Sequence, residues 1–224
     1  MKTEEQRRAR ELRAEGCSVK EIERHLGVAR SSVSRWVKDV QLGDEQRRAL
    51  AARVTEGRLQ AAERKARAAR LVRAADQQEG RRLARERDAS YAAGCMLYWA
   101  EGEKNRCRLS VSNSDVDLLR LFVGFVRDHF DVPEGKMRIH CHLFADHLDR
   151  QHEIEQFWLT ALGLPSARLG KSVVNTYSKY SEKKRKNKLP YGTCKLTVNS
   201  TRVVQMVFGS IQEYGGFERP EWLD

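Results

Sequence analysis

Residues 17–40 read CSVKEIERHLGVARSSVSRWVKDV, and this stretch decides the fold of the first part of the chain. Ser18 opens a predicted helix, and Glu21 follows three residues later, as a capping box requires. Ile22 and Leu26 share one face of this helix, and Gly27 makes the turn that ends it. A second helix is predicted to follow at once. Its inner face consists of three apolar residues, namely Val33, Trp36 and Val37.

The outer face of this second helix is polar and basic. Its side chains are those that a recognition helix presents to base edges and phosphates in the major groove. They are Arg30, Ser31, Ser32, Ser34, Arg35 and, just beyond the helix, Lys38. With a first helix predicted over Thr3–Ala14, residues 1–42 resemble the helix-turn-helix of resolvase and homeodomain-like proteins. Two positions depart from that family, because Ala29 replaces a Ser or Thr cap and Glu23 replaces a small residue. The alternative is a small helical bundle without a nucleic-acid role.

The overall charge also indicates a polyanionic partner. The formal net charge is +11, and the sequence pI is about 9.6. Such a balance is typical of proteins that bind DNA, RNA or an anionic membrane surface, and charge alone does not separate these. Neither a membrane-spanning run nor a signal peptide is evident, so we expect a cytoplasmic protein without a membrane partner. The five cysteines are odd in number and form no CxxC pair, which favours free thiols over disulfides or a zinc ribbon.

Residues 43–89 are predicted to form a long basic helical linker. The stretch from Asp44 to Ala92 lacks proline and is rich in Ala, Arg, Glu, Gln and Leu, a composition that favours helix. A continuous helix here would span roughly 70 Å. Its apolar positions keep no heptad, so a long coiled coil is not expected. The helix is either a solvated spacer or a surface that contacts phosphates, and the two roles are compatible. The candidate contacts are Arg58, Arg64, Arg67 and Arg70.

Residues 90–224 have the pattern of a second, α+β domain. Three segments, 106–112, 136–142 and 193–199, alternate apolar and polar residues as half-buried strands do. Amphipathic helices are predicted over 115–130, 149–162 and 200–214, which gives helices packed on one face of a mostly antiparallel sheet. The polar faces of the three strands lack carboxylates, which favours a sheet that lies against DNA over an ordinary solvated face. Their basic residues are Arg106, Arg108, Arg138, His140, His142 and Lys195.

The segment that opens this domain, residues 94–104, reads GCMLYWAEGEK. It resembles the core helix of LAGLIDADG homing endonucleases, and the resemblance extends over residues 92–214. It implies a sheet that lies in the DNA major groove and makes Glu101 the acid that binds a divalent metal. The family's packing glycine and second acid are replaced by Met96 and Trp99. Some sporulation regulators also join such a domain to a helix-turn-helix without cutting DNA.

Two further clusters are candidates for DNA contact. The first comprises His140, His142, His147 and His152, for which a metal site is the less favoured alternative. The second lies in residues 181–192, SEKKRKNKLPYG, and is interpreted as a phosphate clamp, with a solvated loop as the alternative. Its basic residues are Lys183, Lys184, Arg185, Lys186 and Lys188.

These observations predict a sequence-specific protein that binds double-stranded DNA with both domains. The predicted role is a bacterial or phage transcriptional regulator, specifically a repressor, which needs no cofactor and no metal. It would act as a monomer on an asymmetric site or as a homodimer. One alternative is a Mg²⁺-dependent homing-type endonuclease with Glu101 as its metal-binding acid. Another is a recombination accessory protein.

Overall fold

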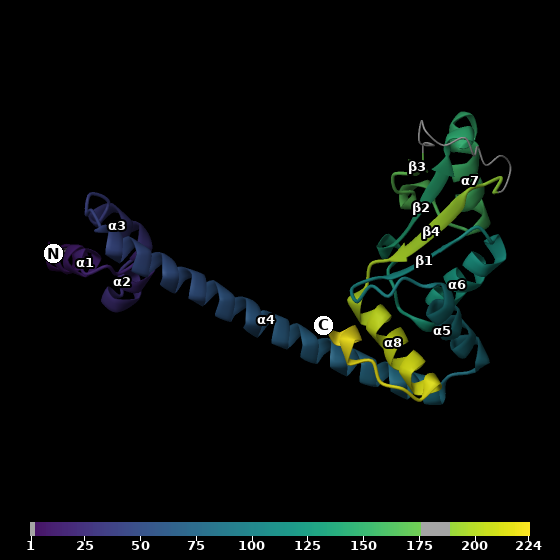
Figure 1. Ribbon diagram of the computed structural model, residues 1–224, viewed down its shortest axis with the longest axis horizontal. Coiled ribbons are helices and arrows are strands. Elements are labelled where there is room, and N and C mark those ends of the chain that lie inside the picture. Colours follow the sequence, from purple (N-terminus) through teal and green to yellow (C-terminus); the bar gives the residue numbers. More distant parts are fainter. Residues whose placement is uncertain (1–2, 176–188) are drawn as a thin grey trace. The chain divides into compact units, whose positions relative to one another are not determined.

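The computed structural model describes residues 3–175 and 189–224. Its contacts divide the chain into two compact units, Met1–Ala68 and Ala69–Asp224. The boundary falls inside the long helix α4, Asp44–Glu86, so each unit includes part of that helix (Figure 1). We describe each unit separately.

The first unit begins with three short helices, α1 (Thr3–Ala14), α2 (Val19–Leu26) and α3 (Arg30–Trp36). The predicted capping box at the start of α2 is confirmed, because the Ser18 side chain accepts from the Glu21 amide and the Glu21 carboxylate accepts from the Ser18 amide. Gly27 ends α2 in the left-handed conformation, with φ of 65°, which an L side chain rarely adopts. The core of this unit consists of Ala9, Leu12, Ile22, Val33 and Val37.

The long helix α4 confirms the helical prediction, but its second part is not a solvated spacer. Gln77, Gly80 and Leu83 of α4 are buried in the second unit. A Cβ on Gly80 would lie 1.9 Å from the Met206 carbonyl oxygen, so α4 crosses a helix of the second unit with backbone against backbone. Composition alone could not reveal this crossing, because a helix rich in alanine and arginine can be either exposed or half-buried. The helix also ends earlier than residue 89, since Asp88 caps the next one.

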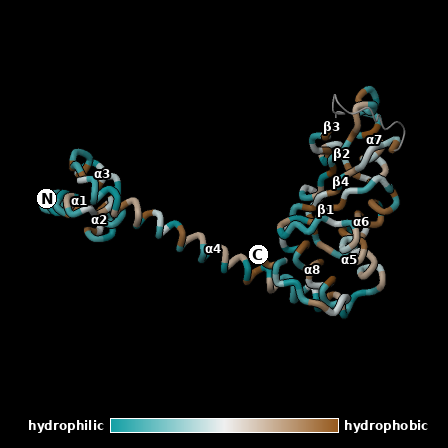
Figure 2. Tube along the Cα trace, viewed as in Figure 1, coloured by the Kyte–Doolittle hydropathy of each residue, from teal (hydrophilic) through white to brown (hydrophobic). Residues whose placement is uncertain are grey.

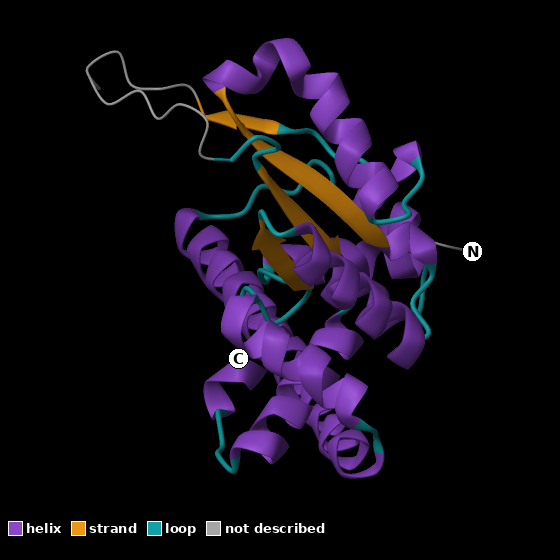
Figure 3. Ribbon diagram, turned by 90° about the vertical axis from the view of Figure 1, so that its right-hand side faces the viewer, coloured by secondary structure: helices purple, strands orange, loops and turns teal. Residues whose placement is uncertain are grey.

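The second unit is α+β, as the sequence predicts. Along the chain its major elements are α5 (Ala89–Glu101), β1 (Leu109–Asn113), α6 (Val116–His129), β2 (Met137–Phe144), α7 (Gln151–Ala161), β3 (Val173–Asn175), β4 (Thr193–Val198) and α8 (Thr201–Gly215). Short 3-10 turns lie at Glu134–Lys136, Ala145–Arg150, Ser166–Arg168 and Pro220–Leu223. The four strands form a single sheet of order β1-β4-β2-β3 (Figure 3). The β1–β4 and β4–β2 pairings are antiparallel, and β2–β3 is parallel.

The register of the sheet places its apolar residues on one face. Val111 lies opposite Leu196, which lies opposite Ile139, and all three are fully buried. Cys141 and Cys194 also face each other in this layer, as free thiols in the core. Helices α5, α6, α7 and α8 contribute the other side of the core, through residues such as Tyr98, Phe122, Ile154, Trp158 and Phe208. The opposite face of the sheet is therefore the one left to polar side chains.

The short strand β3 is the element that alternation does not predict. It has only three residues, and it pairs with the end of β2 through His142–Val173, Leu143–Val174 and Phe144–Asn175.

The long helix α4 mixes hydrophilic and hydrophobic residues along its length, without a continuous apolar stretch (Figure 2). In the described ranges, no helix combines the length and apolarity that crossing a bilayer needs.

Candidate nucleic-acid interface

Helix α3 presents the predicted side chains to solvent. Its inner face buries Val33, and the adjoining Val37 closes the same core. Arg30, Ser31, Ser34 and Arg35 are exposed, together with Lys38 just beyond the helix, whereas Ser32 is half-buried. Ala29 provides no side-chain cap, as its chemistry requires.

The cations on and just after α3 have no partner among the described residues, unlike the arginines of α1. Arg30, Arg35 and Lys38 make no hydrogen bond or ion pair with the residues that the structure describes. Several other arginines of the unit bond to its own residues. Arg10 bonds the Asp39 carboxylate at 2.7 and 2.8 Å, Arg13 donates to the Cys17 carbonyl, and Arg53 donates to the Gly16 carbonyl. Arg30, Arg35 and Lys38 are thus available to an external anion, as are Lys20 of α2 and Arg58 and Arg67 of α4.

Helix α2 adds two basic side chains that sequence reasoning did not single out. Lys20 and Arg24 are both exposed, one turn apart, on the side of α2 opposite the buried Ile22. Their spacing of four residues, out of phase with Ile22 and Leu26, was the signal available in the sequence. The Arg24 charge lies near Glu21, whose pKa is held below its usual range chiefly by hydrogen bonds from Ser18. Lys20 has no recorded partner in the described part of the chain.

The second candidate surface is the polar face of the sheet in the other unit. Three of its predicted residues come together there. Lys195 of β4 lies opposite His140 of β2, and Arg138 lies two residues before His140 on the same face of β2. Arg138 and His142 are exposed, and His140 and Lys195 are half-buried. Part of this polar face is covered and not exposed to solvent. Ser110 and Thr197 are buried and bond each other at 3.0 Å.

The strands of this face carry no carboxylate themselves, but a neighbouring segment adds one to it. Glu103, from the segment between α5 and β1, forms an ion pair with Lys195, and its other oxygen lies 4.0 Å from Arg108. Glu103 belongs to none of the three strands, and the tertiary fold places it beside them because α5 ends next to β1. Arg106 does not join the face. It lies before β1, where its carbonyl oxygen accepts from Gln205 of α8.

The histidines do not form one cluster. His147 is buried and accepts a hydrogen bond from the Phe144 amide at its Nδ1, so it caps the turn after β2. His152 is exposed on α7. His140 and His142 remain on the sheet face, and the pKa of His142 is lowered by partial burial and then by the charges of Lys195 and His140. Within the described ranges, no three His, Cys, Asp or Glu residues are grouped as a metal site requires.

Glu101 is exposed at the end of α5. Its carboxylate accepts from the Asn113 side-chain amide at 3.2 Å. The Lys104 ammonium donates to the carbonyls of Trp99 and Gly102 at 2.8 and 2.7 Å, which closes the C-terminal end of α5. Burial lowers the pKa of Lys104, and the nearby Glu101 charge opposes that shift. Glu101 thus belongs to a local network of polar contacts within this chain.

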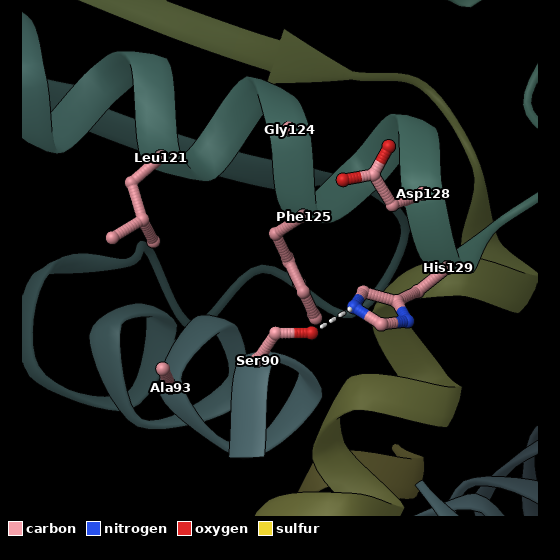
Figure 4. A pocket seen from close by; sticks show the side chains of 7 residues that line it. All are labelled: Ser90, Ala93, Leu121, Gly124, Phe125, Asp128 and His129. Atoms are coloured by element: carbon pink, nitrogen blue, oxygen red, sulfur yellow. Dashed lines mark hydrogen bonds between the residues drawn. The ribbon is translucent and has the colours of Figure 1, made fainter. Parts of the chain in front are cut away.

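The groove between α5 and α6 contains a serine and a histidine but no activated nucleophile (Figure 4). Ser90 Oγ donates to Asp88 at 2.7 Å, so it must accept from His129 Nε2, 3.0 Å away. A serine nucleophile requires the reverse, with its proton given to the histidine. The group is explained by its local role, because Asp88 caps α5 and also accepts from the amides of Ser90 and Tyr91.

Of the arginines of α4 that were predicted to contact phosphates, some are free for an external partner and others are used within the chain. Arg58 and Arg67 of α4 are exposed and have no recorded partner in the described chain, and Arg64 bonds the Gln60 carbonyl of its own helix. Arg70 forms an ion pair with Asp224 and is used within the second unit. The basic loop residues Lys183, Lys184, Arg185, Lys186 and Lys188 lie outside the described residues.

In comparisons with protein-family models, curated proteins and solved structures, nothing matches the chain.

Proposed function

We propose that the protein binds double-stranded DNA in a sequence-specific manner and acts as a transcriptional regulator. The observation that carries the proposal is the distribution of arginine partners in the first unit. Arg10, Arg13 and Arg53 are bonded to the fold, whereas Arg30 and Arg35 of α3 are exposed and have no partner in the part of the chain that the structure describes. Unpaired cations on the outer face of the last helix of a compact trihelical unit match the chemistry of a recognition helix.

The serines of α3 support the proposal. Ser31 and Ser34 are exposed beside the arginines, and hydroxyl groups both donate to and accept from base edges. Arginine provides the base-specific part of such recognition, because its two nitrogens match the O6 and N7 acceptors of guanine. Lys38, and Lys20 on α2, would contribute charge to phosphates without selecting a sequence. The polar sheet face of the second unit is proposed as an additional contact surface. Arg138 and His142 have no hydrogen-bond partner there among the described residues, and His140 contacts the Lys171 carbonyl at 3.4 Å.

The experiment is an affinity selection followed by two matched variants. The full chain is incubated with a pool of randomised duplexes, and bound DNA is amplified over several rounds until a preferred sequence is obtained. Binding of that sequence is then compared for wild type, Arg35→Ala and Arg8→Ala. Arg35→Ala is expected to weaken binding to the selected sequence by about 1–3 kcal/mol, the worth of one base-specific arginine.

Arg8→Ala is the control because it removes the same charge from an exposed arginine of the same unit. Arg8 lies on α1 and is paired with Glu11 at 3.0 Å, so it should leave affinity within a few-fold of wild type. Thermal unfolding of both variants verifies that neither change disturbs the fold. A pool that never enriches, or equal affinities for wild type and Arg35→Ala, would remove α3 from the proposal.

The nuclease alternative gains no support from the surroundings of Glu101. A carboxylate that binds Mg²⁺ for catalysis needs open coordination positions and further oxygen ligands. Glu101 instead accepts from Asn113, and among the described residues no three His, Cys, Asp or Glu side chains are grouped as a metal site requires. The selected duplex should therefore stay intact when the wild-type protein is incubated with it in Mg²⁺ or Mn²⁺. Cleavage that Glu101→Gln abolishes would establish the alternative.

A further inference from the structure

Glu103 occupies a fixed position next to the polar face of the sheet. Its amide donates to the Ser110 carbonyl at 2.8 Å, and its own carbonyl accepts from the Tyr98 hydroxyl. The residue before it, Gly102, bridges to Val111 of β1, and a Cβ there would lie 2.2 Å from the Tyr98 ring. The backbone at 102–103 therefore runs along β1 as a short additional edge of the sheet. Its attachment does not depend on the Glu103 side chain.

The Glu103 carboxylate is directed to cations of the sheet. It pairs with Lys195 on the central strand β4 and lies 4.0 Å from Arg108, which precedes β1. Arg138, His140 and His142 of β2 share this face, and none of them has a carboxylate partner in the described residues. Glu103 is thus the single negative charge that the described chain places against this cationic surface.

The ion pair between Glu103 and Lys195 is only partly buried, since the two side chains are 39 % and 21 % exposed. Partial exposure to solvent weakens its contribution to stability. Because backbone hydrogen bonds already hold residues 102–103, the carboxylate is not needed to fix the segment. A phosphodiester oxygen is the same kind of acceptor as a carboxylate oxygen, and Lys and Arg bind both.

We propose that Lys195 and Arg108 form a subsite for a DNA backbone phosphate, and that Glu103 occupies this subsite in the free protein. Glu103 then sets the affinity of the sheet for DNA, because a phosphate must displace the carboxylate from both cations. The inference rests on the proposed function, since it takes DNA as the ligand. It concerns a surface separate from α3, so the two proposals can fail independently.

The test is a variant expected to bind more tightly than wild type. Glu103→Gln keeps the size of the side chain, removes its charge and leaves the backbone bonds of residues 102–103 intact. Binding of the full chain to a random-sequence 30-base-pair duplex is measured by fluorescence anisotropy over a series of salt concentrations. We expect affinity to rise by about threefold to tenfold at low salt. The slope of log K against log salt should steepen by roughly 0.9, the value for one additional phosphate contact.

Two further variants separate a subsite from a general change in charge. Glu153→Gln removes one carboxylate from the same unit, where Glu153 pairs with Arg150 at 2.6 Å on α7, and should leave the salt slope at its wild-type value. In a Lys195→Gln background, Glu103→Gln should no longer steepen the slope, because the cation that it liberates is absent. Thermal unfolding is recorded for every variant. If Glu103→Gln does not fold, Glu103→Asp withdraws the carboxylate from Lys195 by one methylene and should shift the affinity in the same direction.

Equal salt slopes for wild type, Glu103→Gln and Glu153→Gln would overturn the subsite, whatever the result at α3. Equal increases for Glu103→Gln and Glu153→Gln would also overturn it, because only net charge would then matter. If wild type fails to bind any duplex and Glu103→Gln fails as well, the proposed function itself is wrong. A loss of specific binding in Arg35→Ala with unchanged slopes at Glu103 would leave α3 as the DNA-binding surface and remove the sheet.

Discussion

Replacing Gly80 by alanine should destabilise the second unit, although alanine is the better helix former. A Cβ at residue 80 would lie 1.9 Å from the Met206 carbonyl oxygen and 2.6 Å from its carbonyl carbon. Gly209 of α8 faces α4 in the same way, with a Cβ position 2.0 Å from the Gln77 carbonyl oxygen. Both obstacles are backbone atoms, so neither can rotate away. To accept the methyl group, the two helices must separate by more than an ångström at their crossing.

The expected cost follows from what that separation disturbs. Alanine gains about 1 kcal/mol in helix propensity over glycine, and overpacking costs about 1–3 kcal/mol. Separation also strains the bonds across the crossing, from Ser210 to the Gly80 carbonyl at 2.8 Å and from Gln77 to Gln205 at 2.8 Å. Because each such bond contributes about 1 kcal/mol, we expect a net loss of about 1–3 kcal/mol.

Urea unfolding followed by tryptophan fluorescence measures this loss, since Trp222 stacks on Phe208 of α8 with ring centroids 4.4 Å apart. Gly57→Ala is the matched control in the same helix, because nothing lies within 4 Å of its Cβ position. It should leave the midpoint unchanged or raise helicity, by up to about 1 kcal/mol in propensity. An unchanged or higher midpoint for Gly80→Ala would show that the helices do not cross at this contact.

Two further predictions concern helix caps. Ser18→Ala removes the acceptor for the Glu21 amide and should cost about 1 kcal/mol, which faster amide hydrogen exchange in α2 would reveal; unchanged protection would contradict the capping box. The pKa of Asp88 is lowered first by the Ser90 hydroxyl and then by the Tyr91 amide, so its contribution to stability is present at neutral pH and is lost as pH falls through the folded-state pKa. Asp88→Asn keeps a capping oxygen but cannot titrate, so its melting temperature should fall less steeply with acid than that of wild type; parallel profiles would refute the assignment.

Local rules predict much of this fold. The Ser18–Glu21 spacing, the Gly27 turn and the inner face of α3 all follow from contacts within one or two turns of helix, and the structure confirms them. The alternation that predicts β2 and β4 is equally local. The residue at which α4 ends is harder to predict from the sequence, because alanines continue past it. Asp88 followed by Ser90 was the available sign of a new cap.

Features that depend on distant segments could not be predicted in this way. The burial of Gln77 and Gly80 arises from α8, more than 120 residues further along the chain. Strand β3 is too short for a recognisable alternation and exists because it pairs with β2. The charge of a sheet face is likewise a property of everything that packs beside it. Reading charges along β1, β2 and β4 omitted Glu103, which reaches the face from the end of α5.

The two carboxylates that follow Trp99 show why the position of an acid is insufficient evidence for metal chemistry. Both Glu101 and Glu103 lie where α5 meets the sheet. Glu103 forms an ion pair with Lys195, and Glu101 accepts a hydrogen bond from Asn113. A metal site would require these carboxylates to hold negative charge in excess of nearby positive charge. At Glu103 the balance is the opposite, since both Lys195 and Arg108 lie within 4.0 Å of its carboxylate. Such an environment suits the binding of an anion when the Glu103 carboxylate moves aside, and a DNA phosphate is the anion that the proposed function supplies.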